Sequence, residues 1–95
     1  MVPRLDLPDT TVVNLVTAAQ LEDGEDYAIQ NDSTGTAAEV LLEERTDPDD
    51  ASTGVSSRRL YPRDTIIYRC NYEHPSVAQL SNPFQPAVLR FSGPI

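Results

Sequence analysis

His74 is the only histidine of the chain, and Cys70, the only cysteine, lies just before it. A Ser–His or Cys–His nucleophilic pair would have to use this histidine as its base. Cys70, however, closes an apolar run, where a buried and unreactive thiol is common. The sequence also has neither a Gly-rich phosphate loop nor a dinucleotide-binding fingerprint. We therefore interpret His74 as a surface loop residue, predict no catalytic or cofactor-binding residues, and expect a protein that is not an enzyme.

Three aspartates, Asp47, Asp49 and Asp50, crowd the polar segment 46–54. Carboxylate oxygens are the ligands that Ca²⁺ prefers. Their spacing differs from that of a calcium-binding hand, and Pro48 stiffens the segment. We interpret it as a solvated acidic loop and predict no metal site, with a bound cation as the alternative. A single cysteine and a single histidine exclude a zinc-type ligand cluster.

Arg58, Arg59 and Arg63 are three of the seven basic residues in a chain of net charge −8. Arginine forms planar, bidentate pairs with carboxylates. One interpretation is a subunit contact, in which these arginines of one copy meet the acidic loop 47–50 of another. The other is an exposed edge strand that its charges guard against unwanted pairing.

The segments that carry these residues are predicted to be short strands separated by turns. We expect strands at 10–16, 27–30, 37–45, 55–61, 65–70 and 87–91, and an irregular segment at 71–85 that Pro75 and Pro83 interrupt. Segment 37–45 also has helical propensity, but a helix this short is marginal and its neighbours are all strands. The pattern predicts an all-β fold, a small antiparallel β-sandwich or barrel of about six strands, spanning residues 10–95.

Residues 1–9 form an extended N-terminal arm in this prediction. Pro3 and Pro8 lack the N–H that a central strand needs, yet Val2, Leu5 and Leu7 are apolar and would gain by burial. We expect these three residues to dock on a neighbouring chain rather than on the protein's own core.

Composition limits the possible partners. The chain has 95 residues, of which 15 are acidic and 7 basic. This balance opposes binding to nucleic acid and to anionic membranes. A chain with 39% apolar residues and no tryptophan holds a small core and gains stability from neighbouring subunits. No apolar run approaches the roughly 18 residues of a membrane span. The first residues do not match a signal peptide, so we expect synthesis in the cytoplasm.

The segment from Leu21 to Asn31 resembles the opening of small tailed-bacteriophage virion proteins, a turn followed by Tyr-x-Ile-Gln-Asn. A strand at 40–45, an Asp/Pro-rich loop at 46–54, an Arg/Leu-x-Pro turn at 60–64 and a strand at 65–69 follow in the order seen in that family. The resemblance covers residues 10–70. It does not extend to the tryptophan that the family usually carries near its last strands.

The resemblance implies a non-enzymatic structural protein of the virion. A capsid decoration, or cement, protein is the first expectation, with the major capsid protein or another virion protein as its partner and a homo-oligomer, expected to be a trimer, as its assembled form. A tail or adaptor accessory protein is the second. The residues leave a further alternative, a free-standing module that binds carbohydrate or a host receptor through the 71–85 segment with Tyr72, His74 and Phe84.

Overall fold

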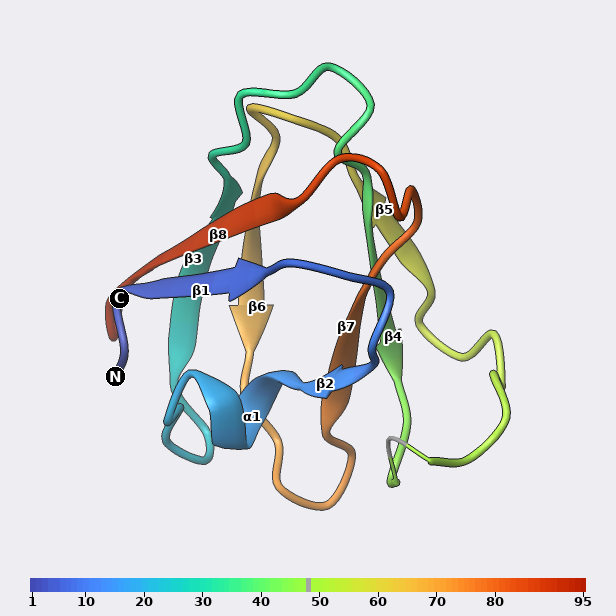
Figure 1. The fold of residues 1–95 in the computed structure, drawn as a ribbon. Helices are drawn as coiled ribbons and strands as arrows, with labels where there is room; N and C mark the ends of the chain where they lie inside the picture. Colours follow the sequence, from blue (N-terminus) through green and yellow to red (C-terminus); the bar gives the residue numbers. More distant parts are fainter. Residues whose placement is uncertain (48) are drawn as a thin grey trace.

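A computed structural model describes residues 1–47 and 49–95 of the chain. Within these residues the chain forms two four-stranded antiparallel sheets and one helix of four residues (Figure 1). In chain order the elements are β1 Arg4–Leu7, β2 Val13–Asn14, α1 Leu15–Ala18, β3 Asp26–Asn31, β4 Val40–Glu44, β5 Arg58–Leu60, β6 Thr65–Arg69, β7 Ser76–Leu80 and β8 Ala87–Ser92. No helix in the described residues has the length and hydropathy needed to cross a membrane.

The strand order shows how the chain is wound. One sheet has the order β1-β8-β3-β6 and the other β2-β7-β4-β5. The first strand therefore pairs with the last, the second with the seventh, the third with the sixth and the fourth with the fifth, all antiparallel. This is the winding of a jelly roll, a double sheet built from two Greek keys. The predicted all-β sandwich is confirmed, with eight strands in the described residues.

The core lies between the two sheets, as the period-2 alternation of strand side chains requires. Tyr27 and Ile29 face inward from β3, Val40 and Leu42 from β4, and all four are at most 4% exposed. The remaining buried apolar positions come mainly from the other strands and from α1, and include Leu15, Leu60, Leu80, Leu89 and Phe91.

The N-terminal segment corrects the expectation of a detached arm. Arg4–Leu7 is a strand that pairs with β8, and Leu7 is only 1% exposed in the protein's own core. Pro3 and Pro8 flank this strand rather than interrupt it, and a strand at a sheet edge needs hydrogen bonds on one side only. The main chain before β1 is also bonded, because the Val2 N–H donates to the Ala19 carbonyl at 2.8 Å.

Two further elements differ from the expectation. The segment 71–85 contains β7, which is an inner strand of its sheet. Pro75 comes immediately before β7, where a missing N–H costs no ladder bond. The expected strand 10–16 is shortened to β2, because the Asn14 side chain accepts a hydrogen bond from the Thr17 N–H at 3.2 Å and caps α1.

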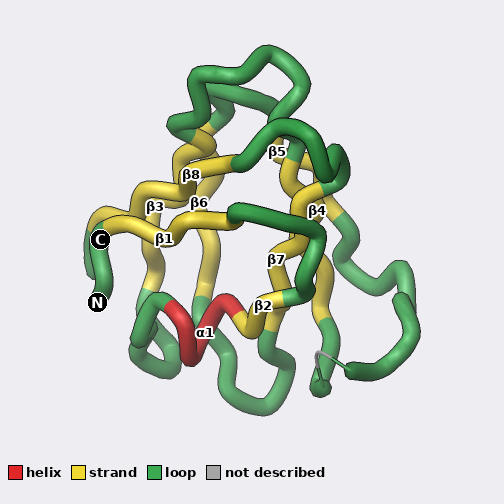
Figure 2. The backbone as a smooth tube through the Cα atoms, viewed as in Figure 1, coloured by secondary structure: helices red, strands yellow, loops and turns green. Residues whose placement is uncertain are grey.

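The connecting segments gather at two ends of the sandwich. Those after β3 and after β5 meet at one end, while α1 and the segment after β6 lie at the other (Figures 1 and 2). The buried Asn31 fastens the first end, since its Nδ2 donates to the carbonyls of Ala38 and Leu60 at 2.7 and 2.8 Å. These bonds fix the connecting segments at this end of the sandwich, where a partner could bind, to the buried core.

Candidate functional site: the groove between strands β5 and β6

A groove of about 800 Å³ opens between the edge strands of the two sheets. It lies where β5 begins and along most of β6. The groove is lined by the apolar side chains of Leu42 and Ile66, by Tyr68, and by the polar or edge residues Glu44, Ser56, Ser57, Arg58, Ile67, Arg69, Asn71, His74 and Ser76. This surface contains His74 and Arg58, two of the residues that the sequence singles out.

His74 faces a carboxylate in this groove. Its Nδ1 lies 3.1 Å from Oε1 of Glu44, and its side chain is 62% exposed. The Ser56 hydroxyl donates to the other oxygen of Glu44 at 3.4 Å. The carboxylate therefore lies between the hydroxyl and the imidazole. A nucleophilic triad needs the imidazole in the middle, so that it can take the hydroxyl proton.

Cys70 does not supply a nucleophile either. Its side chain is 1% exposed. Burial raises the pKa of the thiol, and the negative charge of Asp23 raises it further. A thiol with a raised pKa stays protonated, and the thiolate is the reactive form.

Tyr68 is the residue of the groove that sequence reasoning missed. Its hydroxyl is buried and makes no hydrogen bond of regular geometry in the described residues, although Ser76 lies close enough to lower its pKa. Burial is the main reason that the pKa of Tyr68 is raised. Only the alternation of β6 could have signalled this position, because it places Tyr68 on the same face as Ile66.

The three arginines of the expected cluster point to different places. Arg58 stands opposite Leu42 in the β4–β5 register and lines the groove. Arg59, the next residue, faces the other side of the sheet and forms an ion pair with Glu39. Arg63 lies in the turn after β5 with a φ of 77°. Among the described residues, Arg58 and Arg63 form no ion pair.

The acidic loop after β4 is organised by its own main chain. Oδ1 of Asp47 accepts a hydrogen bond from the Asp49 N–H at 3.0 Å, and Asp47, Asp49 and Asp50 are all exposed. Within the described residues, no three His, Cys, Asp or Glu side chains are placed to hold a metal ion. Pro48, which the sequence interpretation used to explain the stiffness of this loop, lies outside the described residues.

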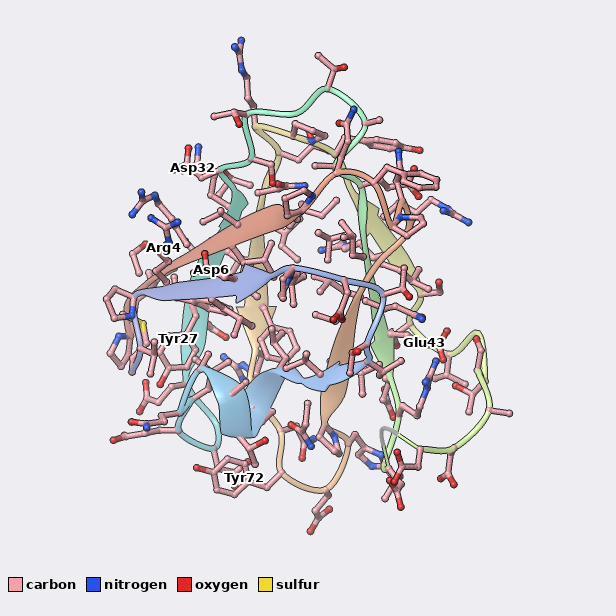
Figure 3. The ribbon with its side chains drawn as sticks, in the orientation of Figure 1. Arg4, Asp6, Tyr27, Asp32, Glu43 and Tyr72 are labelled. Atoms are coloured by element: carbon pink, nitrogen blue, oxygen red, sulfur yellow. The ribbon has the colours of Figure 1, made fainter. Side chains whose placement is uncertain are left out.

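A buried ion pair holds the rest of that loop. Glu43 is 1% exposed, and its carboxylate accepts hydrogen bonds from the Ser52 hydroxyl at 2.6 Å, the Thr53 N–H at 2.9 Å and the Arg45 guanidinium at 3.1 Å. The bond from Ser52 is the largest cause of the lowered pKa of Glu43, followed by that from Thr53, and Arg45 contributes less. Figure 3 shows Glu43 on the side of β4 that faces this loop. The spacing of Glu43 and Arg45, two residues apart on one strand face, is the signal that could have predicted the pair.

The other expected binding residues are spread over the molecule. Leu7 is buried in the core, while Val2 and Leu5 are partly buried. Tyr72 lies at the α1 end, where its hydroxyl donates to the Leu21 carbonyl at 2.8 Å (Figure 3). Phe84, which is 89% exposed, lies at the opposite end of β7. The aromatic residues of the 71–85 segment therefore do not form one site.

Comparison with known proteins adds no evidence to this geometry. No protein-family model matches the chain, and neither the curated proteins nor the solved structures contain a match to it.

Proposed function

We propose that this chain is a non-enzymatic structural protein of a bacteriophage particle, and that it binds the capsid exterior as a decoration protein. The observation that supports this proposal is the strand order of the two sheets, β1-β8-β3-β6 and β2-β7-β4-β5. It is the winding used by viral capsid domains, and by lectins and cupins as well. A fold hosts several functions, so the proposal also draws on the groove, whose polar and apolar lining suits contact with another protein.

The charge of the chain fits the same role. A net charge of −8 disfavours contact with the packaged nucleic acid, which suits a position on the outer surface. It also suits a partner surface that carries positive charge.

The proposal is tested on purified particles of the virus whose genome encodes the chain. Heads and tails are separated, and quantitative mass spectrometry measures the copies of this chain per major capsid protein in each. We expect many copies on heads, and we expect heads from a deletion strain to assemble but to open at a lower temperature. Copies confined to tails would move the protein to the tail or adaptor alternative. Absence from both fractions, with the chain present in the lysate, would contradict the proposal.

A second candidate function rests on a different cavity. A space of about 500 Å³ beside α1 is lined by Tyr72, by the apolar residues Val16, Leu21 and Pro75, and by amide, hydroxyl and carboxylate side chains, namely Asn14, Thr17, Gln20, Glu22 and Thr46. Tyr72 is 56% exposed, and an aromatic face beside such groups is suited to binding a sugar ring. This candidate predicts that a glycan array detects binding, and that Tyr72→Ala abolishes it while Tyr61→Ala, a change at a similarly exposed tyrosine, does not. An array without any binding would remove this candidate.

A further inference from the structure

The described residues contain four strands at sheet edges, and three of them are protected against pairing with another chain. β1 is flanked by Pro3 and Pro8 and carries charged side chains. β2 has only two residues. β5 has three residues, two of which are arginines. Short length, proline and charge are the devices that keep an edge from pairing.

The fourth edge, β6, is longer than the others and has no proline, and its one charged residue, Arg69, is paired within the chain. It has five residues, Thr65–Arg69, without a proline, and its register with β3 is continuous. Its central residue, Ile67, is 59% exposed. The charge of Arg69 is neutralised by Asp26, which accepts from the guanidinium at 2.9 and 3.2 Å. A long, apolar and unguarded edge is one that pairs with another strand.

The hydrogen bonds at both ends of β6 show which of its residues face outward. The Cys70 N–H donates to the Glu25 carbonyl at 2.9 Å, and the Asp64 carbonyl accepts from the Asn31 N–H at 2.9 Å. In an antiparallel pair, hydrogen-bonded and non-hydrogen-bonded residues alternate. Residues 66 and 68 are therefore bonded to β3, while Thr65, Ile67 and Arg69 direct their N–H and C=O groups to the free edge.

We propose that two copies of this chain associate through β6, antiparallel, about a two-fold axis at Ile67. In this register Ile67 pairs with Ile67 of the second copy, and Thr65 pairs with Arg69 of the second copy. The outward main-chain groups of all three residues are then used, and the interface is self-complementary, as a two-fold contact must be. The inference goes beyond the proposed function and does not depend on it.

The charges favour this register over other contacts between two copies. Each copy carries −8, so most surface contacts bring like charges together. Along β6 the pairing sets each arginine opposite a threonine, and each arginine already faces Asp26. The centre of the contact is apolar, because Ala28 of β3 stands next to Ile67. β6 is thus a neutral strip on an acidic molecule.

Tyr68, the neighbour of Ile67, lines the adjoining groove. Its buried hydroxyl has Ser76 of its own chain beside it, so the inference rests on the main-chain edge of β6 and not on this side chain.

Disulfide cross-linking tests the register. Hydrogen-bonded residues of an antiparallel pair have Cα atoms about 5.5 Å apart, which is within the range of a disulfide. We expect Ile67→Cys to form a covalent dimer under mild oxidation, and a mixture of Thr65→Cys and Arg69→Cys copies to form a mixed dimer. Thr65→Cys by itself should not cross-link, because the two cysteines would lie roughly 14 Å apart along the strand direction, at about 3.4 Å per residue. The unchanged chain is the background control, since Cys70 is buried.

Mass measurement in solution tests the association itself. The unchanged chain should sediment as a dimer, and Ile67→Lys should weaken dimerisation by about tenfold or more, which corresponds to at least about 1.4 kcal/mol. Phe84→Lys, a change at an exposed apolar residue between β7 and β8, is the matched control and should leave the dimer intact. A monomer at all concentrations, or a trimer that Ile67→Lys does not affect, would overturn the inference. Cross-linking of Thr65→Cys to itself would overturn the register.

Discussion

The two edge strands of the sheet β1-β8-β3-β6 are both exposed to solvent, but they differ in the features that prevent pairing with another strand. β1 is bounded by Pro3 and Pro8, and Arg4 and Asp6 form an ion pair on its exposed face (Figure 3). β6 has Ile67 at its centre and no proline. Because a free edge can template another strand, the contrast indicates that β1 is built to remain an edge and β6 is built to be covered.

The largest expected effect is loss of the fold when residues 1–8 are deleted. The deletion removes Leu7 from the core and takes the neighbour from one side of β8. Truncating a single buried leucine costs about 2–5 kcal/mol, and typical total stabilities are about 5–15 kcal/mol. Urea unfolding should show a much lower midpoint or no cooperative transition. At protein concentrations low enough to keep the chain monomeric, the change Ile67→Lys on the opposite edge should alter stability by only about 0.5 kcal/mol. A deletion variant that unfolds like the full chain would support the expectation that residues 1–9 form an arm detached from the core.

The next effect concerns the buried pair rather than either edge. Glu43→Ala removes the carboxylate that Arg45, Ser52 and Thr53 contact, and breaking a buried pair costs about 3–5 kcal/mol. Glu44→Ala, a change at the neighbouring and partly exposed residue, is the control. If both variants unfold at the same urea concentration, the buried pair does not stabilise the fold as its burial indicates.

The same pair has a pH dependence of known sign. The pKa of Glu43 is lowered from its ordinary value of 4.5 in the folded chain. The ionised carboxylate therefore contributes its full stabilisation above about pH 4.5. That contribution decreases as the pH falls through the lower, folded-state pKa. Unfolding midpoints measured between pH 7 and pH 3 should fall in the unchanged chain, and by less in Glu43→Gln.

A smaller effect is expected when the protection of β1 is removed. The triple change Pro3→Val, Arg4→Thr and Asp6→Thr leaves Leu5 and Leu7 in place and makes β1 resemble β6. We expect the variant to form assemblies larger than the dimer at high concentration, as measured by sedimentation velocity. A variant whose sedimentation is unchanged would show that the proline and the charged residues of β1 do not explain the difference between the two edges.

The smallest expected effect lies at the ion pair of β6. Asp26 is bonded to the exposed guanidinium of Arg69, which is the main cause of the lowered pKa of Asp26. Exposed pairs of this kind contribute little. Asp26→Asn should leave the melting temperature unchanged and, because Arg69 faces Thr65 across the proposed two-fold axis, should weaken the dimer only slightly. A strong decrease in dimerisation would mean that charge, rather than the unpaired main-chain groups of β6, drives the association.

Local pattern was sufficient to predict the strands that carry their own apolar alternation. The expected strands 27–30, 65–70 and 87–91 correspond to β3, β6 and β8, and the ambiguous segment 37–45 contains β4. The prolines misled the prediction at β1 and β7, because Pro3, Pro8 and Pro75 lie just outside these strands. Sequence shows that a proline lacks an N–H, but the pairing partner decides whether that N–H is needed.

The candidate site was less predictable because its residues are brought together by pairing across the sheets. The run from Arg58 to Arg63 is one cluster in sequence, yet strand alternation separates Arg58 from Arg59. Tyr68 and Glu44 meet the groove only because β6 and β4 belong to different sheets whose edges lie together. No spacing in the sequence carries that information.

The position of β8 has a consequence for the synthesis of the protein. β8 lies between β1 and β3, although it is translated long after both of them. Until residues 87–92 leave the ribosome, β1 has no strand to pair with, and β3 lacks one of its two neighbours. Structures dominated by such distant pairings form slowly, and an unfinished sheet exposes apolar surface that favours aggregation. The growing chain therefore completes this sheet only after β1 to β7 have been made. A chain truncated before residue 87 contains no strand with which β1 can pair.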